Sequence, residues 1–407
     1  MDKKQYGWWI CFACSLMLFC NTGLSTTGFS IYQPYLIRLG GLTNTQASSL
    51  ILLRNLSGFI GMLCSGKLLQ RFEIRRIVTA GMLINGSAFF FYGISRSFFN
   101  YCFAALLIGF SYGAAGNIPA TILITRWFDR YRGIALGICM ASTGLSTIIA
   151  SPLIMLLMEK HSLQFAFFSE AAFVLCCSII VYALLRSRPE CLHTQPIGII
   201  NSESDRSNQK YASKTAGRSL YLYMLAGIFL FGMPGNILYA HISVLYETSG
   251  FDAMQVSFLL SIFGAALTIG KIGYGYMSDK IGTYRSSWFL YSFCTIGTLL
   301  SCFAWDGSIW IARAAVILMG LGFAVTTVSM PMYAAGISSE SDYAITMSRF
   351  QSLSTLGALL FGTVPGIIAD KTGSYIPAFI AMLFLIIISS VFLQFIFHRI
   401  IRTNVIS

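Results

Sequence analysis

Charged residues are scarce in this sequence of 407 residues. Only 10% of the residues are charged, and 15 acidic residues stand against 27 lysines and arginines. Hydrophobic residues make up 56% of the chain, and the mean hydropathy is +0.71. A soluble domain with so few polar groups could not cover its surface with them. The composition therefore excludes an ordinary soluble protein and indicates a chain embedded in lipid.

Sequence motifs for metal or nucleotide chemistry are also missing. No HExxH motif and no Cys/His cluster indicates a metal site, and no glycine-rich loop ending in Lys and Ser/Thr indicates ATP hydrolysis. No arrangement of nucleophile, base and oxyanion donors emerges either. We therefore expect no cofactor and no enzymatic activity, and a gradient as the source of energy for any transport.

Twelve apolar stretches are long enough to cross a hydrocarbon core, which takes about 20 residues. Only helices can span lipid here, because open strands leave backbone groups without hydrogen bonds. The expected fold is an all-α integral membrane protein with twelve transmembrane helices. The predicted spans are 8–36, 46–67, 77–95, 99–125, 133–157, 164–186, 219–246, 254–278, 286–305, 308–335, 344–368 and 375–397.

The distribution of Lys and Arg predicts the orientation, since cytoplasmic loops retain these residues. With the N-terminus inside, most of the 27 fall on the inner side, so both termini are expected in the cytoplasm. The net charge of +12 then reflects topology and an anionic inner leaflet, and nucleic-acid binding need not be invoked. The basic residues expected on the outer side are Arg38, Arg96, Lys160, Arg313 and Lys371.

One long polar segment, 187–218, separates two halves, 1–186 and 219–407, and we interpret it as a cytoplasmic linker. The halves repeat a loop pattern between their second and third spans. It starts at Gly66 in the first half and at Gly275 in the second, 209 residues later. This offset is typical of a duplicated six-helix unit.

At this loop the chain resembles the major facilitator superfamily, whose signature is Gly-x-x-x-Asp-Arg/Lys-x-Gly-x-x-Arg/Lys. The first copy keeps Gly66 and Arg71 but has Gln70 in place of the acid and Glu73 in place of the second glycine. The resemblance implies two six-helix halves and a gating role for the signature residues. The second copy matches through Gly275, Asp279, Lys280, Gly282 and Arg285.

Further stretches resemble the monocarboxylate porters and their oxalate/formate antiporter relatives. They follow in the same order along nearly the whole chain. The resemblance implies transport of small organic anions by alternating access. The stretches are Tyr6 to Trp9, Trp127 to Gly137, His241 with Tyr246 and Gly250, and Pro365 to Tyr375.

Lys271 is the strongest candidate for substrate binding. It lies about 17 residues from the outer end of its predicted span, between Gly270 and Gly273, which would let a neighbouring helix approach closely. A cation retained this deep in lipid usually faces a cavity or a partner. By resemblance it takes the place of a basic residue that binds the substrate carboxylate, while Leu267 replaces the family's accompanying Asp. The alternative is a lysine that extends to the inner interface.

Arg54 lies near the middle of the second span. Its planar guanidinium can bind a carboxylate through two hydrogen bonds, so a dicarboxylate could bridge Arg54 and Lys271. A structural pair with Glu170 is the alternative. Arg349 lies about five residues into its span, and we expect an interfacial or gating role there.

Other polar residues in the spans could assist transport. His241 and Glu170 are candidates for proton coupling, although His241 could be a packing residue and Glu170 a structural one. Pro119, Pro234 and Gly235 are expected to interrupt their helices. Four residues could bind the substrate or merely bridge helices: Asn117, Tyr112, Thr27 and Tyr239.

The sequence thus predicts a secondary transporter of small organic anions, either monocarboxylates or short dicarboxylates, acting by proton symport or anion exchange. Its expected partners are the anion, protons and the lipid bilayer, and we expect a monomer in the cytoplasmic membrane of a bacterium. Proton-coupled efflux of drugs is an alternative, weakened by the presence of a single deep acid. A non-transporting membrane sensor on the same fold is another.

Overall fold

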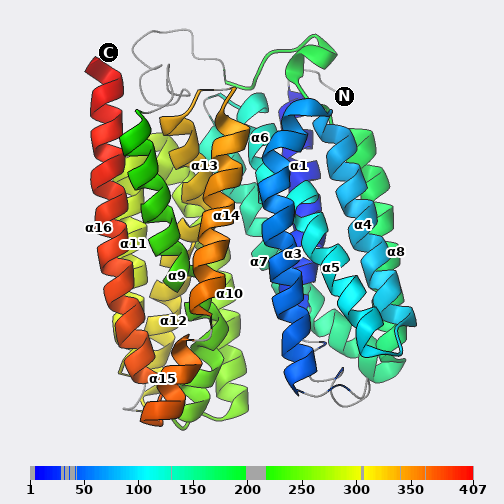
Figure 1. The fold of residues 1–407 in the computed structure, drawn as a ribbon, viewed down its shortest axis with the longest axis vertical. Coiled ribbons are helices and arrows are strands. Elements are labelled where there is room, and N and C mark those ends of the chain that lie inside the picture. The colour runs from blue at the N-terminus through cyan, green and yellow to red at the C-terminus, as the bar shows by residue number, and fades with distance from the viewer. Residues whose placement is uncertain are drawn as a thin grey trace. The chain divides into compact units, whose positions relative to one another are not determined.

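The computed structural model of the chain describes residues 5–28, 32, 36, 42, 44–129, 131–198, 217–303, 307–339, 341–362 and 364–406. These residues form α-, π- and 3-10 helices, shown in Figure 1, and strand-like pairing among them is limited to one isolated bridge between Phe128 and Ile197. The expected all-α fold is confirmed.

The chain divides into two compact units, Met1–Asn201 and Ser202–Ser407. The first contains α1 (Tyr6–Leu18), η2 (Phe19–Gly28), α3 (Asn44–Arg71), α4 (Ile74–Ile94), α5 (Phe98–Ala115), α6 (Asn117–Trp127), α7 (Arg132–Lys160), α8 (Leu163–Leu184) and η3 (Pro189–Leu192). The second contains α9 (Arg218–Thr248), α10 (Ala253–Ile281), α11 (Thr283–Ser301), α12 (Ile309–Phe323), α13 (Val325–Ile337), α14 (Tyr343–Phe361), α15 (Val364–Thr372) and α16 (Ile376–Ile406).

Eleven stretches of the described residues are long and apolar enough to cross a membrane. The predicted span that is not among them, 286–305, is the ninth along the chain and corresponds to α11, which has 19 residues and a high content of Ser and Thr. Its hydroxyls bond to backbone carbonyls one turn earlier, as in Ser286 to Gly282 at 2.9 Å and Ser301 to Gly297 at 3.0 Å. Because these groups are satisfied within the helix, α11 can lie in an apolar bundle.

The helices of the predicted spans are not interrupted at the prolines that the sequence suggested. The fourth span breaks at Gly116, between α5 and α6, and Pro119 lies in the first turn of α6, where its missing N–H leaves no hydrogen bond unmade. The helix α9 continues through Pro234 without interruption. The expectation of interruptions at Pro119 and at Pro234 and Gly235 is therefore wrong.

The helix packing within the first unit recurs within the second. In the first, α3 packs on α5, α4 on α8, and α1 on α7; in the second, α10 packs on α12, α11 on α16, and α9 on α14. If the predicted spans are numbered one to six within each half, the same spans pack together in both halves: the second on the fourth, the third on the sixth, and the first on the fifth. The duplication inferred from the loop pattern thus extends to the packing of each half.

Candidate functional site

Lys271 lies on α10. This helix begins with a reciprocal cap, in which Asp252 Oδ1 accepts the Gln255 N–H at 2.8 Å and Gln255 Oε1 accepts the Asp252 N–H at 3.2 Å. The side chain of Lys271 is only 4% exposed. A cation this deeply enclosed in a membrane-spanning helix is costly and usually functional.

The backbone beside Lys271 touches a neighbouring helix. A Cβ added to Gly270 would lie 2.5 Å from the carbonyl oxygen of Leu321 on α12. The expected close approach is therefore confirmed for Gly270. At Gly273 an added Cβ would meet no described atom within 4 Å, so the expectation fails there.

Arg54 is half-buried on α3. Its Nη1 donates to the Ser25 carbonyl at 2.7 Å and its Nη2 to Asn55 Oδ1 at 3.4 Å. These two acceptors are a backbone carbonyl and a side-chain amide oxygen.

Three other candidates for substrate binding lie with Arg54 in the first half. Asn117 Nδ2 donates to the Tyr112 hydroxyl at 3.2 Å across the break at Gly116. Thr27 belongs to η2, but its side chain lies outside the described residues. Tyr239, in the second half, is 37% exposed and stacks on Phe263 with ring centroids 5.3 Å apart.

Glu170 lies on α8 and is 5% exposed. Its carboxylate interacts with the Tyr32 hydroxyl, and neither of its oxygens is in hydrogen-bonding geometry with any described residue. Tyr32 is held by stacking on Phe167 at 4.1 Å. The suggested pair between Glu170 and Arg54 is not formed in the described part of the chain.

His241, the other candidate for proton coupling, lies on α9. Its Nε2 is 3.2 Å from the Gly362 carbonyl, and its ring stacks on Tyr375 with centroids 5.7 Å apart. These contacts are the ones expected of a packing histidine.

The second loop signature joins α10 to α11. Gly275 is buried, and Gly282 ends α10 with a φ of 84°, which is favourable only for glycine. Lys280 lies 4.6 Å from the centre of the Tyr276 ring. Asp279 is half-buried, and Arg285 is exposed at the start of α11.

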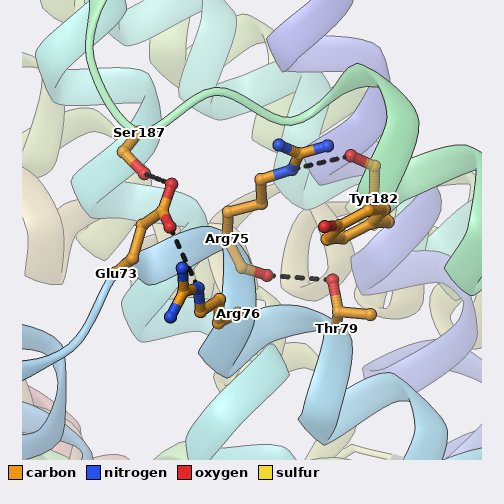
Figure 2. A network of polar contacts seen from close by, with 6 residues as sticks. All are labelled: Glu73, Arg75, Arg76, Thr79, Tyr182 and Ser187. Carbon is orange, nitrogen blue, oxygen red and sulfur yellow. Dashed lines mark hydrogen bonds and ion pairs between the residues drawn. The ribbon is translucent and has the colours of Figure 1, made fainter. Parts of the chain in front are cut away.

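The first signature is built differently. Gly66 is buried and Arg71 is the exposed last residue of α3, but Glu73 has a φ of −64°, so this turn needs no glycine. Figure 2 shows Glu73 paired with Arg76 at 3.3 Å and accepting the Ser187 hydroxyl at 3.4 Å. Glu73, one of the two residues that depart from the signature, therefore joins the α3–α4 turn to the chain after α8.

The neighbouring Arg75 strengthens this connection. Its Nε donates to the Tyr182 carbonyl at 2.9 Å, and its guanidinium lies 3.9 Å from the centre of the Tyr182 ring (Figure 2). Arg349, on the second half, is exposed and donates to the Tyr221 hydroxyl at 3.3 Å.

Sequence reasoning missed a buried polar cluster beside Arg54. Its members are Asn21, Ser25, Asn85 and Ser111, each at most 2% exposed. Buried amides in apolar spans are rare, so Asn21 and Asn85 could have been recognised from their positions alone.

Comparison with known proteins identifies the family. The sequence model of the Major Facilitator Superfamily matches residues 14–330 and, in a second match, residues 224–404. The chain belongs to the major facilitator superfamily. Members of this superfamily are transporters rather than enzymes, so this chain is a multi-pass membrane transporter.

Individual members agree with this assignment. Monocarboxylate transporter 12 of mouse is 23% identical over 437 aligned positions, covering 98% of this chain and 87% of the relative. The expected resemblance to the monocarboxylate porters is thereby confirmed. Two solved superfamily structures share the fold: the human organic anion transporter MFSD10 (TM-score 0.74, 14% identity, 97% and 100% coverage) and the proton:xylose symporter XylE (0.75, 11%, 95% and 95%).

Proposed function

We propose that the protein transports small organic anions, monocarboxylates or short dicarboxylates, by alternating access. The observation that carries this proposal is the burial of Lys271, whose side chain ends in an ammonium group and which lies on a membrane-spanning helix. Retaining a charge there costs at least about 2.5–3.5 kcal/mol on insertion scales, and binding of a negatively charged substrate would offset that cost.

The character of the buried charges supports an anion over a cation. Each half contributes a basic side chain, Arg54 or Lys271, within its bundle, whereas Glu170 is the acid found deep in a span. Transporters of lipophilic cations need buried acids to bind their substrates. Two of the similar proteins are named for monocarboxylate and organic anion transport, which agrees in chemical class.

Within this proposal, Lys271 and Arg54 recognise the carboxylate by charge, and Tyr112 and Asn117 hydrogen-bond the substrate near Arg54. Thr27 and Tyr239 are further contacts for it. The second loop signature and Arg349 act in gating.

Coupling is to protons or to a counter-anion. In the proton case Glu170 is the proton-carrying group, because its carboxyl interacts with a neutral hydroxyl and no described hydrogen bond occupies it. His241 is less suited, since its ring nitrogen already bonds a carbonyl.

We further propose that the protein acts as a monomer in the cytoplasmic membrane of a bacterium, with both termini in the cytoplasm. The distribution of Lys and Arg along the sequence supports this orientation.

Transport by purified protein in liposomes tests the proposal. Uptake of labelled formate, lactate, oxalate and a larger dicarboxylate is measured with and without an inward proton gradient, alongside transport of the cation ethidium. We expect uptake of at least one carboxylate and no ethidium transport. Stimulation by the gradient would indicate symport, and stimulation by anion inside the liposomes would indicate exchange. Ethidium transport without carboxylate uptake would refute the proposal, and correctly folded protein that moves neither would favour the sensor.

A further inference from the structure

The first membrane span changes its helix type part-way. α1 ends at Leu18, and residues Phe19–Gly28 continue as the π-helix η2. Long π-helical stretches are rare, and short ones are frequent at functional sites. In a π-helix, hydrogen bonds join residues five apart, so such residues lie on the same side of the helix. In an α-helix they would be rotated by about 140° from each other.

Asn85 of α4 bonds two groups of η2 with this spacing. Its Oδ1 accepts the Ser25 hydroxyl at 3.0 Å, and its Nδ2 donates to the Cys20 carbonyl at 3.3 Å. Asn85 is 0% exposed, so both bonds are protected from water. One amide therefore holds a backbone carbonyl and a side-chain hydroxyl that are five residues apart in η2.

Ser25 connects this amide to Arg54. The Ser25 carbonyl is the acceptor for Arg54 Nη1 at 2.7 Å, the shorter of the two hydrogen bonds that the guanidinium makes to Ser25 and Asn55. The position of this carbonyl depends on the register of η2. Ser25 thus links Asn85, through its hydroxyl, to the Arg54 guanidinium, through its carbonyl.

We propose that Asn85 is a positioning residue for the Arg54 guanidinium in recognition of the substrate carboxylate. It holds η2 in the register that places the Ser25 carbonyl against Nη1. This inference rests on the proposed function, in which Arg54 binds the anion. A displacement of about 1 Å in such a group is sufficient to impair recognition.

The chain offers a matched control on the same segment. Asn21 of η2 exchanges hydrogen bonds with Ser111 of α5: Asn21 Nδ2 donates to the Ser111 carbonyl at 3.0 Å, and Asn21 Oδ1 accepts the Ser111 hydroxyl at 3.3 Å. Asn21 is as buried as Asn85 and also makes two hydrogen bonds, but neither leads to Ser25 or Arg54. Loss of Asn21 therefore removes a similar structural contribution without disturbing the connection to the guanidinium.

The test is the kinetics of carboxylate uptake in liposomes by Asn85→Ala, Asn21→Ala, Ser25→Ala and Arg54→Gln. We expect Asn85→Ala to raise KM about tenfold while Vmax per folded transporter changes less than about twofold. This is the effect of losing one hydrogen bond to a charged group, here the bond between the Ser25 carbonyl and the Arg54 guanidinium. Ser25→Ala, which keeps the carbonyl, should raise KM less. Asn21→Ala should leave KM unchanged even where it lowers thermal stability as much as Asn85→Ala does.

A double variant completes the test. In the Arg54→Gln background, Asn85→Ala should raise KM no further, because the group that it positions is gone. Equal KM values in Asn85→Ala and Asn21→Ala, or a full further increase in the double variant, would overturn the inference. A wild-type KM in Arg54→Gln would overturn the inference as well. The proposed function is tested separately, by carboxylate uptake with the unaltered protein.

Discussion

The close contact between α10 and α12 beside Lys271 can be tested by adding one methyl group. In Gly270→Ala the new Cβ would lie 2.5 Å from the Leu321 carbonyl oxygen and 2.9 Å from its Cα. Both neighbours are backbone atoms, so no side chain can rotate away. The helices would have to separate by roughly 1 Å to restore ordinary contact distances. Overpacking of this kind costs about 1–3 kcal/mol.

Gly273→Ala is the matched control. It makes the same substitution three residues later on the same helix, where nothing described lies within 4 Å. The gain in helix propensity is therefore shared by both variants, and only the contact differs. We expect Gly270→Ala to be about 1–3 kcal/mol less stable than Gly273→Ala in thermal unfolding followed by helical circular dichroism in detergent, and to show slower uptake. Equal stability of the two variants would show that the backbones at Gly270 and Leu321 are not in close contact.

Three further predictions concern the titratable groups and the α3–α4 turn. His241→Phe should keep the pH profile of uptake, since the ring packs against Tyr375 and bonds a carbonyl; a shifted profile would assign proton coupling to His241. Glu170→Gln should abolish stimulation of uptake by an inward proton gradient and retain anion exchange, because an amide cannot carry the proton; full stimulation in this variant would exclude Glu170. Glu73→Gln should change stability by less than about 1 kcal/mol in thermal unfolding, since its ion pair with Arg76 is exposed; a larger loss would show that the turn is a structural clamp.

The fold was predictable because the lipid environment permits few alternatives. Long apolar runs had to be helices, and the repeated loop at Gly66 and Gly275 indicated the duplication that the packing of each half displays. Breaks within the spans were less predictable. A proline in the first turn of a helix, as at Pro119, leaves the helix intact, whereas the break occurs at Gly116, which no spacing rule marks.

Those features of the candidate site that depend on the chemistry of single residues could be predicted from the sequence. The burial of Lys271 follows from its depth in an apolar span, and the close approach at Gly270 follows from the absence of a side chain. The partners of Arg54 were not predictable. They depend on the position of the Ser25 carbonyl within the π-helical segment η2, and such a segment leaves no periodic signal in the sequence. The suggested pair between Arg54 and Glu170 is not formed between these described residues, because two buried opposite charges need not face each other.

The central claim is that a buried ammonium group on α10 recognises a negatively charged substrate. The most direct measurement compares carboxylate uptake into liposomes by the unaltered protein, by Lys271→Gln and by Lys160→Gln, which removes the same charge at an exposed position at the end of α7. The account predicts that Lys271→Gln inserts and purifies normally but loses uptake, while Lys160→Gln retains it. Unchanged uptake by Lys271→Gln would contradict the claim.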